Sequence, residues 1–305
     1  MTNAAWPTLP YEAWKDTYET LHMWTQIVGK IRLARMPWLN HCWQVTLYPT
    51  ARGLTTGTMP YADAQLQIDF DFVAHELDVQ TSRGARRSIA LVPMTVADFY
   101  HAVMAALAAV GMPVQIYRQP VEVPSRVAFD TDVQHRAYDA EYAQRCWRII
   151  CSSAAVFWRF RSGFCGKASP VHFFWGSFDL AVTRFSGRTA PPHPGGVPNL
   201  PDRVTRDAYS HEVSSCGFWP GGAQAPYPLF YSYAYPEPVG FAGARVQPAE
   251  ARYDASLHEF VLPYAAVSAA DAPEEKLLAF LQSSYQAAAE HGHWDRPSLE
   301  AAPAG

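Results

Sequence analysis

The stretch VHFFWGSFDLAVTRFSG, residues 171–187, indicates the class of fold that this chain adopts. Side chains two apart share one face of a strand, and here both faces carry bulky apolar groups, such as Phe173 and Phe174. We therefore predict a strand that is buried on both sides. A charged Asp179 or Arg184 in such a strand must form an ion pair or face a polar pocket, because an isolated buried charge is very unfavourable.

Three further strands are predicted after this stretch. They are SHEVSSCGFW (210–219), PLFYSYAYPEP (228–238) and LHEFVLPYAAV (257–267). Helices are predicted on both sides of the strands, because residues 141–160 carry one apolar stripe and Asp271 with Pro273 opens a helix that Gly292 ends. The charged segment 202–208 is predicted as a loop.

The first half of the chain repeats this order. Apolar residues three and four apart predict a helix over residues 14–36, which Pro37 ends. A second helix is predicted between Thr95, which has capping-box spacing with Asp98, and Gly111. Strands are predicted within residues 41–54, 64–84 and 86–92.

Both halves therefore show a helix, about four strands and a helix, which indicates an ancient internal duplication. Short local matches support it, namely residues 40–43 with 171–175 and residues 91–93 with 261–263. An unrelated α+β protein could also show this order, so a fold without duplication stays open.

We predict an α+β protein with mainly antiparallel sheets packed or joined around one core. Its parts are a first half (1–111), a proline-rich extended connector (112–137), a second half carrying the polar site (138–292) and a C-terminal tail (293–305).

Composition excludes several classes of partner. The net charge is −4 with no basic block, so nucleic acid is not an expected partner. The apolar run 102–110 is too short to cross a bilayer, and the first residues lack the features of a signal peptide. Five cysteines without CxxC spacing are typical of reduced thiols in a cytoplasm. We expect a soluble cytoplasmic protein, and the oligomeric state stays open.

Residues 170–222 gather most of the side chains that could carry chemistry. Histidines and carboxylates can transfer protons, and the candidates for acid–base catalysis are His172, Asp179, His193, His211 and Glu212. Cys216 would act as a nucleophile only if a nearby histidine lowered its pKa. A buried structural cysteine is the commoner role.

Substrate-binding candidates lie in the same region and just after it. Arg184 and Arg188 are four apart, close to the glycines of residues 186–196, and would suit an anionic group, although no phosphate-loop pattern is present. Aromatic contact area would come from Trp175, Tyr231 and Tyr233.

A divalent metal is an alternative use of the histidines. His172, His193 and His211 are the candidate ligands, because imidazole is a usual catalytic ligand. Their spacing matches no metal-binding motif. The cofactor requirement is otherwise open.

Several stretches of the chain resemble a bacterial family of domains of unknown function, DUF5996. They are WKDTYETLHMWTQIVGKIRLA (14–34), NHCWQVTLYPTARGLTT (40–56), SPVHFFWGSFDLAVTRFSGR (169–188), PPHPGG (191–196), AYSHEVSSCGFWPGG (208–222) and YAYPEP (233–238). The similarity spans about residues 6–300. The resemblance implies a bacterial, cytoplasmic protein, and it brings no activity, cofactor or catalytic residue.

Three functional hypotheses follow. The first is an enzyme with a His/Arg/acid pocket that acts on a small anionic molecule. The second is a non-catalytic binding module, in which aromatic residues contact a ligand that is never turned over. The third is a scaffold with no site, whose histidines satisfy hydrogen bonds in the core. Concentration of polar residues in one half favours a site over a scaffold.

Overall fold

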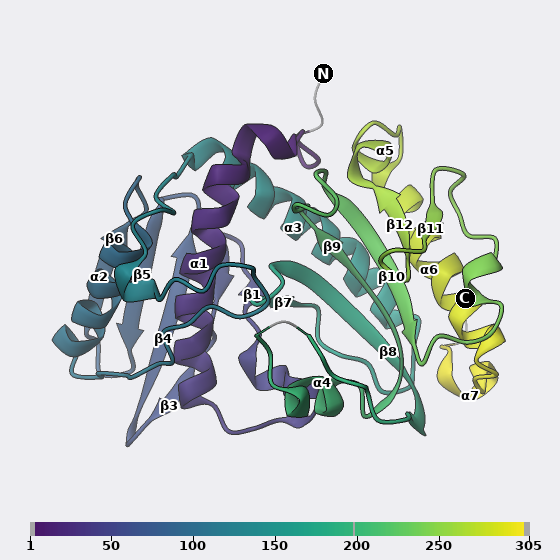
Figure 1. The fold of residues 1–305 in the computed structure, drawn as a ribbon, viewed down its shortest axis with the longest axis horizontal. Helices are drawn as coiled ribbons and strands as arrows, with labels where there is room; N and C mark the ends of the chain where they lie inside the picture. Colours follow the sequence, from purple (N-terminus) through teal and green to yellow (C-terminus); the bar gives the residue numbers. More distant parts are fainter. Residues whose placement is uncertain (1–3, 198, 302–305) are drawn as a thin grey trace.

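Two antiparallel sheets form the framework of the protein, one from each half of the sequence (Figure 1). The computed structural model describes residues 4–197 and 199–301. The N-terminal sheet has the order β1-β2-β4-β5-β6, with β3 paired to β4, and the C-terminal sheet has the order β11-β12-β10-β9-β8-β7. The predicted α+β class is confirmed.

The first half and the connector contain α1 (Tyr11–Arg35), η1 (Asn40–Val45), β1 (Tyr48–Pro49), β2 (Gly53–Thr55), β3 (Met59–Tyr61), β4 (Ala64–Asp71), β5 (Glu76–Thr81), β6 (Arg86–Ala90), α2 (Val96–Ala109) and η2 (Phe129–Thr131). The second half contains α3 (Ala140–Ser162), β7 (His172–Phe174), β8 (Asp179–Thr189), α4 (Asp202–Ala208), β9 (His211–Trp219), β10 (Leu229–Tyr235), η3 (Phe241–Gly243), β11 (Arg252–Asp254), β12 (Glu259–Pro263), α5 (Tyr264–Ser268), α6 (Pro273–His291) and α7 (Arg296–Leu299).

The two sheets are joined at one point. Leu47 and Phe173 exchange two backbone hydrogen bonds, of 2.9 and 2.8 Å, which link the start of β1 to β7. One hydrophobic core runs through both halves and the connector, from Trp24 of α1 to Phe129 of η2 and Phe157 of α3. The halves therefore share a core instead of folding around separate ones.

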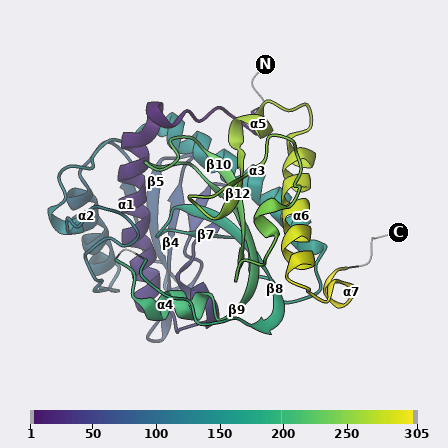
Figure 2. The same cartoon turned by 45° about the vertical axis from the view of Figure 1, so that its right-hand side comes forward.

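Helices cover the sheets unequally. Helix α1 stands in front of the strands of the N-terminal sheet, left of centre in Figure 1, and α3 with α6 covers one face of the C-terminal sheet (Figures 1 and 2). Polar residues of α1 are buried along with apolar ones, among them His22, Gln26 and Lys30. The other face of the C-terminal sheet is free of α3 and α6, and the cavity described below lies against it.

The long helices form where their sequence signals predicted them. Thr95 accepts a hydrogen bond from the Asp98 amide at the start of α2, as expected of a capping residue. Pro273 is the first residue of α6, and Gly292 follows its last residue. Helix α1 ends at Arg35, before Pro37, because a residue that precedes proline disfavours the helical conformation.

Two local predictions were wrong. Residues 40–45 form the 3-10 helix η1 instead of part of a strand, because His41 and Cys42 both take φ 59°. Residues 202–208 form helix α4 instead of a loop, and α4 packs against η1. The aromatic residues of segment 40–45 and the charged residues of segment 202–208 give no local signal for this contact between distant parts of the chain.

The stretch that was predicted as one strand forms a hairpin. Residues 172–174 are β7, Phe178 turns the chain with φ 59°, and β8 begins at Asp179. Each sheet has six strands instead of about four, since several strands of two or three residues are too short to show periodicity.

Helix α7 lies within the predicted C-terminal tail, whose residues 302–305 lie outside the described residues. The internal duplication stays a prediction.

Candidate functional site

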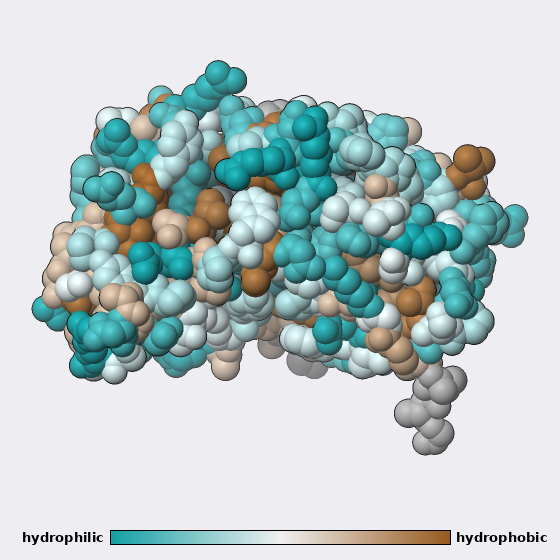
Figure 3. Space-filling view, turned by 90° about the horizontal axis from the view of Figure 1, so that it is seen from below, coloured by the Kyte–Doolittle hydropathy of each residue, from teal (hydrophilic) through white to brown (hydrophobic). Residues whose placement is uncertain are grey.

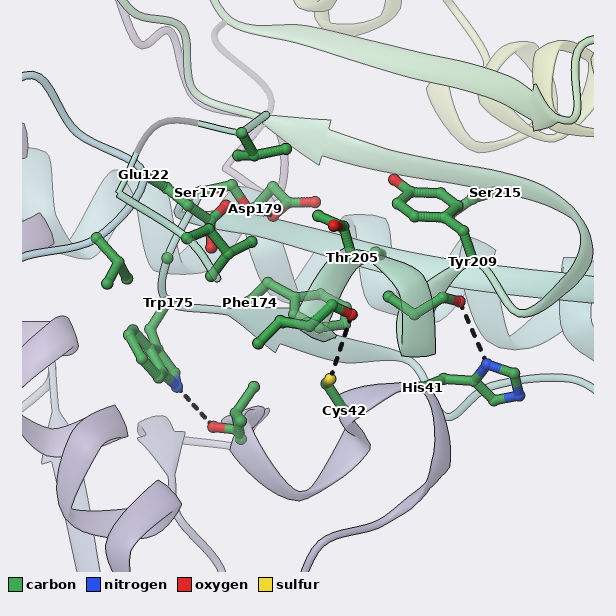
Figure 4. A pocket seen from close by; sticks show the side chains of 18 of the residues that line it. His41, Cys42, Glu122, Phe174, Trp175, Ser177, Asp179, Thr205, Tyr209 and Ser215 are labelled. Atoms are coloured by element: carbon green, nitrogen blue, oxygen red, sulfur yellow. Dashed lines mark hydrogen bonds between the residues drawn. The ribbon is translucent and has the colours of Figure 1, made fainter. Parts of the chain in front are cut away.

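A cavity of about 1060 Å³ lies between the C-terminal sheet and the segments that face it. Its walls come from β8, β9, β10 and β12 on one side and from α1, η1, the connector and α4 on the other. Figure 4 shows Glu122, Ser177 and Asp179 grouped at one end, and His41 and Tyr209 at the other. This volume lies just above the usual range for small-molecule sites, which is about 300–1,000 Å³.

Alternation along the strands builds the sheet wall of the cavity. Every second residue of a strand faces the same side. The strand residues that line the cavity are Asp179, Ala181, Thr183, Phe185, Val213, Ser215, Trp219, Leu229, Tyr231, Tyr233 and Glu259. The Thr183 and Ser215 hydroxyl oxygens lie 2.8 Å apart. The wall therefore combines aromatic surface with hydroxyl and carboxyl groups.

Asp179 is the most completely bonded carboxylate of the wall. It is buried and accepts hydrogen bonds from the hydroxyls of Ser177 and Tyr231. Tyr231 reaches it across β9 at Gly217, where a Cβ atom would overlap the tyrosine hydroxyl. Burial raises the pKa of Asp179, and the two hydrogen bonds act in the opposite direction. Glycine at position 217 is thus required for the Tyr231–Asp179 contact.

Two other carboxyl groups face the cavity with no hydrogen-bond partner among the described residues. Burial raises the pKa of Glu259, at the start of β12, to about 8, and the Asp179 carboxylate adds to this shift. Surrounding protein and then Asp179 raise the pKa of Glu122. Glu122 is nevertheless exposed to solvent, so the effect of its surroundings on its pKa is small.

Lys30 of α1 lines the same cavity as these acids. The residue is 4% exposed, and its ammonium lies 5.3 Å from the ring centroid of Tyr117 and 5.9 Å from that of Trp175. Burial lowers the pKa of Lys30 to about 8, against the attraction of Glu122. Among the described residues it has no ion-pair or hydrogen-bond partner.

Contacts with α1 hold this end of the cavity in place. The Trp175 indole packs on Gly29, where a Cβ atom would overlap the ring, and its nitrogen donates to the Val45 carbonyl over 2.6 Å. Gln26 exchanges hydrogen bonds of 2.8 and 2.9 Å with the backbone of Val121. These bonds position the neighbouring Glu122.

Several residues of the cavity wall have a left-handed backbone. They are His41, Cys42, Glu122 and Asn199, with φ between 58° and 59°. This conformation is unfavourable for residues other than glycine, and it concentrates at functional sites when the surrounding structure maintains it. At Cys42, Asp207 maintains it by accepting hydrogen bonds from the backbone amide and the thiol.

Apolar side chains reach the surface near the cavity. Leu33 and Trp38 line it and are 40% and 47% exposed. The face of the molecule on the side of α4 carries apolar side chains among polar ones (Figure 3). The lining of the cavity is therefore partly apolar where it reaches the surface at Leu33 and Trp38.

The structure brings four of the predicted site residues to the cavity. They are Asp179, Trp175, Tyr231 and Tyr233. The other predicted residues lie elsewhere, so the expected pocket of histidines, arginines and acids is not assembled.

His172 lies beneath the wall of the cavity. It pairs with Ala181 across the hairpin, and its ring contacts those of Phe174 and Trp43, at 4.6 and 6.3 Å between centroids. The side chain is fully buried, neither ring nitrogen has a partner within the described chain, and burial lowers its pKa to about 3. These rings separate His172 from a ligand in the cavity.

Arg184 points to the opposite face of the sheet. Its guanidinium lies over the Phe160 and Tyr285 rings, 3.6 and 4.3 Å from their centroids, under α3 and α6. It donates a hydrogen bond to the backbone carbonyl of Phe160. Arg184 is therefore part of the core and does not bind an anion in the cavity.

Arg188 and Glu212 form an ion pair with each other, at 2.6 Å. Arg188 also donates a hydrogen bond to the backbone carbonyl of Gly292, and this bond connects β8 to the end of α6. His193 stacks on Tyr209 outside the cavity lining, at 4.9 Å between ring centroids. These contacts are structural connections between segments of the second half.

The remaining candidates also lie apart from the cavity acids. His211 contacts His41, 5.5 Å away between ring centroids. Cys216 is buried, which raises its pKa to about 12, so its thiol stays protonated near neutral pH. Within residues 4–197 and 199–301, no three His, Cys, Asp or Glu side chains are arranged to hold a metal ion, and His172, His193 and His211 do not form a site together.

Sequence reasoning missed Lys30, Glu122 and Glu259. Lys30 carried one signal, a lysine close to the apolar residues Val28 and Ile31 of a predicted helix. Glu259 shares its strand face with Val261. A glutamate in such a strand usually faces solvent, so its position alone did not indicate a site. Glu122 lies in an irregular connector, where no periodicity assigns a direction to a side chain.

Over the part of the chain that the structure describes, each helix is too short or too polar to cross a membrane.

Comparison with protein families gives a match over almost the whole chain. A family model with the description "Family of unknown function (DUF5996)" matches residues 6–301. No curated protein and no solved structure matches the chain.

Proposed function

The chain belongs to the DUF5996 family of unknown function, and we propose that it is an enzyme that binds a small organic molecule in the cavity and transfers protons to or from it. The observation that carries the proposal is that Glu122 and Glu259, which have no hydrogen-bond partner among the described residues, line the same cavity as the hydrogen-bonded Asp179. Glu259 is only partly exposed, and polar groups that protein encloses normally find partners. A bound molecule would supply a partner for it.

Burial gives Glu259 a pKa of about 8, so this group is mostly protonated at pH 7 and can act as a general acid. Asp179 accepts two hydroxyl hydrogen bonds, which oppose the rise in its pKa that burial causes. A protonated carboxyl group that shares a cavity with a second, hydrogen-bonded carboxyl group is suited to general acid–base catalysis.

The lining also restricts the kind of molecule that fits. Tyr231, Tyr233 and Trp175 provide aromatic surface, which favours a ligand with an apolar or ring-shaped part. The predicted anion ligands Arg184 and Arg188 are absent from the described lining. At the Asp179 end, the molecule is therefore expected to present uncharged hydrogen-bonding groups instead of an anionic group.

A ligand screen by thermal melting tests the proposal. Wild type and Glu259→Gln would be melted with a library of small metabolites, and consumption of each stabilising compound would be followed by mass spectrometry. Glu274→Gln is the matched control, because Glu274 is exposed on α6 and its cationic partner Arg159 lies 3.7 Å away. We expect a compound that stabilises and is consumed by wild type and by the control, but is not consumed by Glu259→Gln.

Two results would count against this proposal. A compound that stabilises the wild type and is recovered unchanged would identify a binding module without catalysis. Equal consumption by wild type and Glu259→Gln would remove Glu259 from proton transfer.

A further inference from the structure

Lys30 differs from every other lysine of the chain. The chain has only four lysines, at positions 15, 30, 167 and 276. Lys15 and Lys276 form ion pairs with glutamates, and Lys167 hydrogen-bonds to His41. Lys30 alone is buried, and within the described chain its amine has no hydrogen-bond or ion-pair partner.

The surroundings of Lys30 make its amine unusually available as a nucleophile. The rings of Tyr117, Phe129 and Trp175 lie 5.3 to 6.0 Å from the nitrogen and leave no water-rich shell around it. With a pKa of about 8, about a tenth of the amine is unprotonated at pH 7, against about one part in 3,000 for an ordinary lysine. A desolvated lysine of this kind is an activated nucleophile.

A proton donor and acceptor lines the same part of the cavity as this amine. The Glu122 carboxyl group lies against Gly176, next to Trp175, whose ring centroid is 5.9 Å from the Lys30 nitrogen, and Glu122 attracts Lys30 electrostatically. The left-handed backbone of Glu122 and the bonds of its neighbour Val121 with Gln26 fix this placement. Among the described residues, the carboxyl group forms no hydrogen bond or ion pair that would account for it.

We propose that Lys30 condenses with the aldehyde or ketone group of a molecule bound in the cavity, with Glu122 transferring the protons. The Nζ lone pair attacks the carbonyl carbon, and Glu122 carries one proton from the adduct nitrogen to the carbonyl oxygen, which gives a carbinolamine. Glu122 in its protonated form then protonates the hydroxyl group, which leaves as water while the C=N bond forms, and the nitrogen returns its remaining proton to the Glu122 carboxylate. Amine and carbonyl give imine and water, with no change of oxidation state. This inference rests on the proposed function, because the carbonyl compound must first bind in the cavity.

Imine trapping on the full chain tests the inference. The protein would be incubated at pH 7 with glycolaldehyde or dihydroxyacetone and sodium cyanoborohydride, and peptide mapping would give the rate of modification at each lysine. We expect Lys30 to react at least about tenfold faster than Lys15 and Lys276, as the difference in free amine allows. Lys30→Arg keeps the positive charge and should abolish the fast reaction. Lys276→Arg is the matched control and should leave it unchanged.

A second variant separates nucleophilic from merely structural roles of Lys30. Glu122→Gln should slow the modification of Lys30 and leave that of Lys15 unchanged, because only Lys30 uses the Glu122 proton. Thermal melting of each variant would establish that it is folded. Modification of Lys30 in folded wild type no faster than that of Lys15 would overturn the inference.

The outcomes also separate this inference from the proposed function. A ligand whose consumption needs Glu259 but which is also consumed by Lys30→Arg overturns the role of Lys30 and leaves proton transfer by the acids intact. Fast, Glu122-dependent trapping at Lys30 supports the carbonyl chemistry even if Glu259→Gln is fully active.

Discussion

Replacing Glu259 by glutamine should change how the stability of the protein depends on pH. The pKa of Glu259 is raised from 4.5 to about 8 in the folded state. Between these values the folded protein keeps a proton that the unfolded chain releases. Wild type is therefore expected to lose stability as the pH rises from about 4.5 to about 8, and no further contribution from this group arises above that range.

The size of the effect follows from the same shift. At about 1.4 kcal/mol per pH unit, the window from 4.5 to about 8 corresponds to at most about 5 kcal/mol. The Glu259 side chain is only partly buried, and solvent reduces such effects, so we expect about 2 kcal/mol. Glutamine keeps the shape of the side chain and cannot ionise. Glu259→Gln should therefore match wild type near pH 5 and be more stable by about 2 kcal/mol near pH 9.

Urea unfolding of both proteins at pH 5, 7 and 9 measures this difference. Tryptophan fluorescence is a suitable signal, because buried Trp14 and Trp24 lie in the shared core. Glu274→Gln, on the exposed side of α6, should show the pH dependence of wild type. Parallel curves for wild type and Glu259→Gln would contradict the raised pKa, since they would mean that Glu259 ionises in the folded protein as easily as in the unfolded chain.

Three further predictions concern the surroundings of the cavity. His172 has its pKa lowered from 6.5 to about 3, so wild type loses stability as the pH falls through this window, and urea unfolding of His172→Leu should show up to about 1.4 kcal/mol less loss per pH unit. Gly29→Ala places a Cβ atom against the Trp175 ring and should cost about 1–3 kcal/mol of stability in urea unfolding. Arg184→Met should leave the affinity for a cavity ligand, measured by calorimetry, within about twofold, because Arg184 contacts Phe160 and Tyr285 on the opposite face of the sheet.

Local signals predicted the long elements of this fold correctly, and short elements escaped them. The stripe of α1 and the Thr95 cap of α2 each involve neighbouring residues, so the sequence contains them in full. Helix η1 depends on left-handed residues at His41 and Cys42, which Asp207 supports from a distant segment. Contacts of this kind have no local signature, and aromatic composition alone favoured a strand there.

Alternation within a single strand is a local rule, so residue order alone was enough to separate the two faces of β8. It places Asp179 and Thr183 on one face and Arg184 on the other, as the structure has them. Carried unbroken through residues 171–187, the same rule would place His172 on the face of Arg184, and this is wrong. The turn at Phe178 pairs His172 with Ala181 and so moves it to the side of Asp179.

Packing between distant segments decided the rest of the site. Helices α3 and α6 cover the face of Arg184, and the cavity lies on the face of Asp179. Lys30, Glu122 and Glu259 reach that cavity from three separate parts of the chain. Their proximity depends on how α1 and the connector pack across the C-terminal sheet, and such long-range packing leaves no pattern among neighbouring residues.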